Sequence, residues 1–567
     1  MSTDHPHIIP EIERWPISRF SENKESFIEE MNVHTLKKIL ETKDHTVEEI
    51  IASTIYKEKI RVKVSPWKVD PRDEKEYWSK FEKEFKDNSL SPNKEEQNLV
   101  ILKKIINRYS SEICGNFNPK TYRFARIFLF GFFKRLFNKV YKSGYRRPWG
   151  NRKQLWSKLL TKGAIKEVRE LSKIGTIVMV PTHHSNLDSI MVGYMIDSKL
   201  GIPAFTYGAG LNLFDIELMA YFMNRLGAYK VDRRKKNKIY LESLNTFSTL
   251  SLKRGVNSIF FPGGTRSRSG GLETKLKLGL LSTLIEAQRI HCVEEEEKKI
   301  FVVPLVISYH FVLEAKQLID HHLRAKGKEK YLKPGGSGLG FKTIARFIKH
   351  LFKTESEVIF SLGKPMDVFG NQVNATGESF DEKGKKLDIR DYFKFNGKFV
   401  EDLQRERVYT KILGDNIKKS YLSESIILSS HLLAFGIFKY FELSRPQDDL
   451  FTLLSLPLDT MQIDMPTAVE IVDQLKSVLA DKEANGEIKL SEQIHLPSEE
   501  LISDALKNLG VYHARRPLVK RKNATLVSED FRLLYFYHNR LDDYNIKLDK
   551  DSLNNLANSE SRSKEKV

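Results

Sequence analysis

Two histidines and an aspartate follow an apolar run in the segment TIVMVPTHHSNLDSI. His184 and Asp188 are four residues apart, which is about 40° around an ideal helix, whereas His183 and Asp188 are five apart, about 140°. A pair between His183 and Asp188 therefore requires His183 to lie in the turn before the helix. Ser185 and Asn186 are residues that cap helices, and they favour such a turn.

A carboxylate bonded to one imidazole nitrogen fixes the tautomer and leaves the other nitrogen free to take a proton from an alcohol. The pattern therefore indicates a general base. A helix cap made by the polar residues around His183 and Asp188 remains an alternative from spacing alone. A metal site built from His183, His184 and Asp188 is disfavoured, because no second cluster at ligand spacing accompanies them. We expect no metal.

A second polar segment, NSIFFPGGTRSRSGG, also follows an apolar run. Glycines let backbone amides approach a phosphate, and arginine pairs bidentately with its oxygens. The GK[ST] ending of a nucleotide P-loop is absent. The segment therefore predicts an anion-binding loop, with a solvated basic turn as the alternative. Its candidate residues are Gly263, Gly264, Arg266, Ser267 and Arg268.

Two further segments place polar residues after short apolar runs. LGAYKVDRRKKNK has Asp232, Arg233 and Arg234 at the end of one run. VVPLVISYHFVLEA has Pro304 near its start and Tyr309 near its end. Taken alone, the segment with Asp232, Arg233 and Arg234 is most simply the charged end of a strand. Pro304 taken alone is most simply a residue at a bulge or at the start of a strand.

The elements that must position these residues begin at about residue 171, where short β-rich runs alternate with stretches long enough for helices. Near-continuous apolar strands of this kind predict an α/β fold, with a largely parallel or mixed buried sheet flanked by helices. Reactive side chains at the carboxyl ends of such strands lie where open α/β sheets bind ligands. The expected strands lie in 175–181, 203–208, 227–231, 257–264, 299–308 and 357–365.

The regions on either side of this pattern have helical apolar spacing, so we expect additional helical N-terminal and C-terminal regions. The tail has too little apolar content to fold. The predicted divisions are a helical region at 1–120, an α/β catalytic domain at 121–370, a polar linker or excursion at 371–390, a helical region at 391–550 and a disordered tail at 551–567.

The composition of the chain limits the classes of partner that it can bind and the compartment in which it can lie. The 567 residues include 93 Lys and Arg against 74 Asp and Glu, a net charge of +19 that favours nucleic acid, acidic lipid or a phosphorylated substrate. The two cysteines, Cys114 and Cys292, provide neither a disulfide framework nor a CxxC metal site, so a reducing cytosol fits best. The apolar stretches 127–133 and 426–438 are shorter than the roughly 20 residues of a membrane-spanning helix. We therefore expect a cytoplasmic protein with no transmembrane helix.

In order and spacing, the four polar segments resemble the four motifs of the glycerophospholipid acyltransferase family, and in particular of glycerol-3-phosphate 1-O-acyltransferases. The resemblance extends over about 200 residues and has a weaker echo at 533–541. It departs from the family pattern at Gly263, where relatives carry an acid, and at His310, where they often do. The matching residues are His183 and Asp188, Gly227 and Arg233, Phe261, Gly264, Arg266 and Ser267, and Pro304, Ser308 and Tyr309.

The resemblance implies transfer of an acyl group from acyl-CoA or acyl-carrier protein to the sn-1 hydroxyl of glycerol 3-phosphate, the first step of glycerophospholipid synthesis, with no other cofactor. His183 would be the general base and Asp188 its orienting carboxylate. Lysophosphatidic acid or dihydroxyacetone phosphate remains an alternative acceptor. The residues implied to hold the acceptor are Arg233, Gly263, Gly264, Arg266, Ser267, Arg268 and Pro304.

A basic nucleic-acid-binding protein is an alternative from another class. It would present stacking aromatic residues on a basic platform. The aromatic residues here lie mostly in apolar strands and helices, so we expect no nucleic acid.

A lipid product requires the active site to reach a membrane. The stretch 121–149 interleaves phenylalanines with bases, which favours a peripheral helix on an anionic membrane surface, although burial against the sheet is an alternative. The residues concerned are Phe128, Phe130, Phe132, Phe133 and Phe137 among Arg123, Arg126, Lys134, Arg135, Lys139, Arg146 and Arg147.

Overall fold

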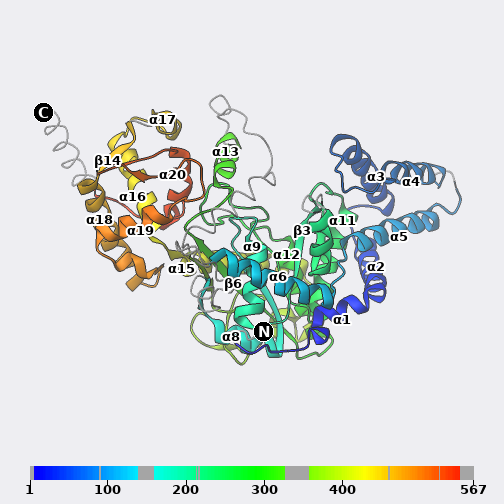
Figure 1. The fold of residues 1–567 in the computed structure, drawn as a ribbon. Coiled ribbons are helices and arrows are strands. Elements are labelled where there is room, and N and C mark those ends of the chain that lie inside the picture. The colour runs from blue at the N-terminus through cyan, green and yellow to red at the C-terminus, as the bar shows by residue number, and fades with distance from the viewer. Residues whose placement is uncertain are drawn as a thin grey trace, which may run out of the picture.

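Figure 1 shows a computed structural model with three parts: N-terminal helices in blue, a central α/β part, and C-terminal helices in yellow to red on the opposite side. The predicted disordered tail and the bases from Lys139 to Arg147 lie outside the described residues. The structure describes residues 5–88, 91–137, 159–211, 214, 217–325, 357–457, 460–522 and 524–549.

Within the described residues, seven strands form one mixed sheet in the order β1-β7-β6-β2-β5-β3-β4. Strands β2, β3, β4 and β6 all run parallel to β5. Strand β7 is antiparallel to β6 and parallel to β1. The expected α/β fold and all six expected strands are confirmed, and β1 is an additional edge strand. The strands are β1 Leu159–Gly163, β2 Gly175–Pro181, β3 Thr206–Gly210, β4 Ala228–Val231, β5 Ser258–Ile259, β6 Lys299–Tyr309 and β7 Val358–Leu362.

Helices cover the sheet, and its central strands are buried along nearly their whole length. Because β2, β4, β5 and β6 point the same way, the four polar segments that follow them emerge at one edge. The central helices are α8 Ile165–Ile174, α9 Asp188–Met195, α10 Glu217–Arg225, α11 Lys238–Lys253, α12 Gly279–Val293 and α13 Ala315–Ala325.

Of the N-terminal helices, α2, α3 and α5 pack on α11, and an ion pair and a hydrogen bond join them to the loop after β4. Arg61 is bonded to Glu58 at 2.7 Å, and Lys235 of that loop pairs with Glu112 at 2.5 Å. Glu58 in turn accepts a hydrogen bond from Asn237, which caps α11. The helices are α1 Pro16–Glu22, α2 Lys24–Leu40, α3 Val47–Val64, α4 Glu74–Asn88, α5 Lys94–Ile113 and α6 Pro119–Phe137.

The polar segment after the sheet forms short antiparallel strands that lead into α15, a helix that packs on α12 and β6. These elements are β8 Gln372–Val373, β9 Ser379–Phe380, β10 Lys386–Leu387, β11 Lys394–Phe395, β12 Lys398–Phe399 and α15 Leu403–Glu424.

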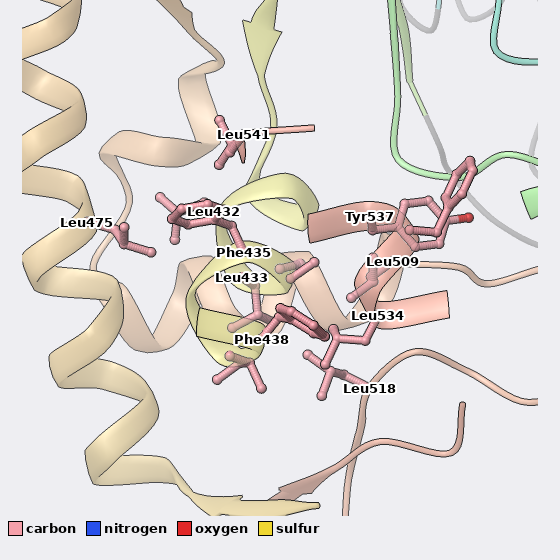
Figure 2. Close-up of a cluster of buried hydrophobic side chains, with 14 of the residues drawn as sticks. Leu432, Leu433, Phe435, Phe438, Leu475, Leu509, Leu518, Leu534, Tyr537 and Leu541 are labelled. Carbon is pink, nitrogen blue, oxygen red and sulfur yellow. The ribbon is translucent and has the colours of Figure 1, made fainter. Parts of the chain in front are cut away.

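The core of the C-terminal part is centred on α16 (Figure 2), and α13 of the central part also contributes to it. Leu432, Leu433 and Phe438 of α16 are buried among side chains of α18, α19 and α20. The apolar stretch 426–438 is therefore core, and no helix within the described ranges has the length and apolar character to cross a bilayer. The elements are β13 Ile426–Ile427, α16 Ser429–Ser444, α17 Leu450–Ser455, β14 Gln462–Asp464, α18 Met465–Ala484, β15 Lys489–Leu490, α19 Ser498–Asn508, β16 Val519–Lys520, β17 Thr525–Val527 and α20 Phe531–His538.

Candidate active site

His183 and Asp188 form a hydrogen-bonded pair at the carboxyl end of β2. Nδ1 of His183 donates to Oδ2 of Asp188 across 2.8 Å. The same oxygen accepts from the backbone amides of His184 and Ser185, at 2.7 and 2.9 Å, and the Tyr309 hydroxyl donates to Oδ1. Asp188 begins α9 and is completely buried. Its carboxylate is therefore held in place by four donors.

The His183 imidazole faces outward from this pair. Its side chain keeps 18% exposure, and its ring packs against Phe261 with the centroids 4.2 Å apart. Because Nδ1 is bound to Asp188, Nε2 is the nitrogen left to act, and it has no hydrogen-bond partner in the described part of the chain. The arrangement can accept a proton from a hydroxyl group at Nε2.

His184 points away from this pair, into the protein. Its Nε2 accepts a hydrogen bond of 2.6 Å from the buried guanidinium of Arg540, beyond the end of α20. Burial, followed by the charge of Arg540, lowers the pKa of His184 well below its usual value. The imidazole that pairs with Asp188 is therefore that of His183, five residues before it, and not that of His184, four residues before it. Arg540 lies in the 533–541 echo seen in the sequence, but its contact with His184 was not predicted.

Glu314 connects the loop after β5 to the histidine segment. Its carboxylate accepts from the Ser185 hydroxyl at 3.1 Å and from the Asn186 amide at 3.0 Å. It also pairs with Arg266 at 3.2 Å. Glu314 is buried, and sequence spacing gave no signal for it. The ion pair places the Arg266 guanidinium beside the turn that carries His183.

Backbone contacts fasten this loop. The amide of Ser267 donates to the carbonyl of His183 at 2.7 Å, and its hydroxyl donates to the carbonyl of Gly271. Gly264 has a positive φ of 73°, and its amide donates to the carbonyl of Phe261 at 2.9 Å. The Gly264 amide thus already has an acceptor within a tight turn, and its use for phosphate stays a prediction.

The two arginines after β4 have different environments. Arg234 pairs with Asp70 at 2.5 Å and Asp232 at 2.7 Å, so its charge is neutralised within the fold. Arg233 is exposed, and no acid pairs with it among the residues that the structure describes. Partial desolvation and then the positive charge of Arg266 lower the pKa of Arg233.

Arg268 and Lys277 add positive charge to the same loop. Arg268 is exposed. A Cβ on Gly264 would lie 2.9 Å from Nζ of Lys277, so this ammonium group packs over the glycine. Pro304 lies deeper, inside β6 and level with Val180 of β2. It supports the sheet beneath the other site residues. Groups of three or more metal-ligating side chains do not occur in the described ranges.

One residue that contacts the backbone of His183 was not predicted from the sequence. Oε1 of Glu273 accepts a hydrogen bond of 2.5 Å from the backbone amide of His183. Burial raises the pKa of Glu273 to about 7. Glu273 lies shortly after two glycines, and no motif spacing in the sequence links it to His183.

Comparisons with known proteins agree with this geometry. Residues 164–308 match the acyltransferase family model. A glycerol-3-phosphate acyltransferase of Pseudomonas aeruginosa is 25% identical over 224 residues, 39% of this chain and 24% of the relative. Those of Alteromonas mediterranea and Histophilus somni are 26% and 29% identical, over 39% and 31% of this chain and 24% and 21% of the relatives. Residues 164–308 of this chain are therefore similar to the acyltransferase family, and the chain matches glycerol-3-phosphate acyltransferases over about a quarter of their length.

Proposed function

We propose that the protein transfers a fatty acyl group from acyl-CoA or acyl-carrier protein to the sn-1 hydroxyl of glycerol 3-phosphate. The observation that carries the proposal is the His183–Asp188 pair, 2.8 Å apart, within a domain that matches the acyltransferase family. The arginines of two neighbouring loops supply the charge that a phosphorylated acceptor needs. The names of the relatives support this acceptor.

In the proposed reaction, Nε2 of His183 takes the proton of the acceptor hydroxyl as its oxygen attacks the thioester carbonyl. Asp188 stabilises the imidazolium that forms. The tetrahedral intermediate collapses with cleavage of the carbon–sulfur bond, and the thiolate receives the proton from His183. The products are an ester and a free thiol. General-base assistance of this kind contributes about 10² to 10⁴ in rate.

The acceptor phosphate is assigned to the cationic groups that the fold does not neutralise fully. Arg233 and Arg268 are exposed, while Arg266 keeps only Glu314 as a partner in the described structure. Lys277 lies over the loop that carries Arg266. Binding the phosphate there orients the hydroxyl toward His183, and such orientation supplies the larger, entropic part of the acceleration.

An apolar face on α6 is proposed to rest on an anionic membrane surface. Phe124, Ile127 and Phe128 are 57, 61 and 60% exposed, and Tyr221 of α10 is 48% exposed. Phe124 stacks on Phe222, which joins the two helices into one surface. The bases Arg123 and Arg126, expected to face lipid, instead pair with Glu13 and Asp197. The aromatic side chains therefore provide most of the described contact surface.

The test uses purified protein with labelled acyl-CoA or acyl-carrier protein, and in parallel glycerol 3-phosphate, lysophosphatidic acid and dihydroxyacetone phosphate. The proposal predicts fastest ester formation with glycerol 3-phosphate, at the sn-1 oxygen by NMR of the product. Faster ester formation with lysophosphatidic acid or dihydroxyacetone phosphate would identify that compound as the acceptor in place of glycerol 3-phosphate. No transfer to any of them would refute the proposed activity.

A further inference from the structure

Glu273 and a side chain at position 263 exclude each other. A Cβ built on Gly263 would lie 2.7 Å from Cγ of Glu273 and 3.5 Å from its Oε1. Real Cβ atoms do not approach other heavy atoms as closely as 2.7 Å, because that distance is well inside van der Waals contact. The Glu273 side chain therefore fills the volume that the side chain of any larger residue at 263 would need.

The Glu273 carboxyl group is also in direct contact with the catalytic segment. Oε1 accepts the His183 backbone amide at 2.5 Å, while Oε2 is buried with no hydrogen-bond partner in the described ranges. The backbone on the other side of His183 is held by the Ser267 amide. The turn that carries the imidazole is thus fastened at both its amide and its carbonyl.

The loop that delivers Glu273 is fixed against the C-terminal part. Gly270 has a φ of 93°, and a Cβ there would lie 2.1 Å from the carbonyl oxygen of Phe536 in α20. Asn539 donates to the carbonyl of Ser269 at 2.9 Å. Glycine at 270 therefore allows the close approach that sets the position of Glu273.

We propose that Glu273 is a positioning residue for His183, and that its carboxylate takes the structural place of an acidic side chain at position 263. This inference rests on the proposed acyltransferase function. Carboxylate oxygens lie three bonds from the Cβ of a glutamate, which is enough to span the gap from position 263 to the present Oε1. A glutamate moved to 263 can therefore hold the same amide, provided that residue 273 is small.

The decisive variants are Glu273→Gly, Glu273→Gln and a double variant that combines Gly263→Glu with Glu273→Gly, called the exchange variant. Glu273→Gly leaves the His183 amide without its acceptor, and we expect kcat to fall about 10- to 100-fold with an unchanged KM for the acyl donor. Glu273→Gln keeps an acceptor oxygen and retains kcat within about threefold. The exchange restores at least about tenfold over Glu273→Gly. Thr274→Ala, an exposed neighbour, is the matched control and changes none of these values.

A second readout does not depend on acyl transfer. In protein labelled with ¹⁵N-histidine, the His183 amide is assigned by its loss in His183→Ala. Its proton shifts upfield in Glu273→Gly and returns downfield in the exchange variant. An unchanged kcat, an unchanged amide signal in Glu273→Gly, or an exchange variant no better than Glu273→Gly overturns the inference. If wild-type protein transfers no acyl group while the amide still responds, the proposed function fails and the contact stands.

Discussion

His184 and Arg540 are hydrogen-bonded at 2.6 Å although 356 positions separate them in the chain. The contact links the segment after β2 to the C-terminal part and gives the two adjacent histidines different roles. His183 faces outward with Asp188 behind it, and His184 supports a buried guanidinium. His431 of α16 adds a second link by donating to the carbonyl of Tyr309 at 2.8 Å.

His184→Ala is expected to destabilise the protein by about 1–3 kcal/mol, because Arg540 loses an acceptor where water does not reach it. Urea unfolding measures this loss. The protein that remains folded keeps most of its kcat. The control is His45→Ala at a side chain that is 59% exposed. A stable but inactive His184→Ala protein would contradict this assignment and favour His184 as the base.

Arg233→Ala and Arg234→Ala form a matched pair on one loop. Arg233→Ala should raise the acceptor KM at least about tenfold with little change in the unfolding free energy, since its charge is unpaired in the described structure. Arg234→Ala should instead lower stability, because Asp70 and Asp232 lose their shared partner. Steady-state kinetics and thermal unfolding separate the two effects. Equal KM values for Arg233→Ala and wild type would remove Arg233 from the acceptor site.

Glu273 predicts a pH-dependent stability difference. Its pKa is raised from 4.5 to about 7, chiefly by burial, so the folded state binds a proton more tightly than the unfolded chain. Ionisation of this group therefore costs stability as the pH rises from about 5 to 8, by at most about 3 kcal/mol. Glu273→Gln cannot ionise, and its stability relative to wild type should rise over that range. Urea unfolding at several pH values tests this, and a constant difference would refute it.

The apolar face on α6 predicts a loss of membrane binding on charge insertion. Phe124→Glu combined with Phe128→Glu should reduce sedimentation with anionic vesicles at least about tenfold, since each buried aromatic side chain contributes about 1.5–3 kcal/mol. Tyr56→Glu is the control, because Tyr56 is 67% exposed on α3. Equal losses in both variants would indicate a general charge effect, contrary to the proposal.

The sequence predicted the elements whose signals are local. Buried strands such as β2 and β6 are continuous apolar runs, and the spacing of His183 and Asp188 limits how the pair can form. β1 was missed because LLTKG is a short edge strand that ends in Lys and Gly. The direction of β7 was not predictable, since an apolar run reads the same in either orientation.

Contacts between distant segments account for the rest. Arg126 looked like a lipid-facing base, but Asp197 pairs with it from 71 residues away. Glu273 reaches the His183 amide from 90 residues away, and no local pattern marks either partner. Motif spacing identified the residue types at the site. Tertiary packing decided which side chains are neutralised and which remain available.

The most direct test is acyl transfer to glycerol 3-phosphate by His183→Ala, beside wild type and His184→Ala. We expect kcat to fall by a factor of about 10² to 10⁴ in His183→Ala, with circular dichroism and the unfolding midpoint unchanged, because only the general base is lost from the reaction. Normal turnover by folded His183→Ala protein would contradict the assignment of His183 as the general base.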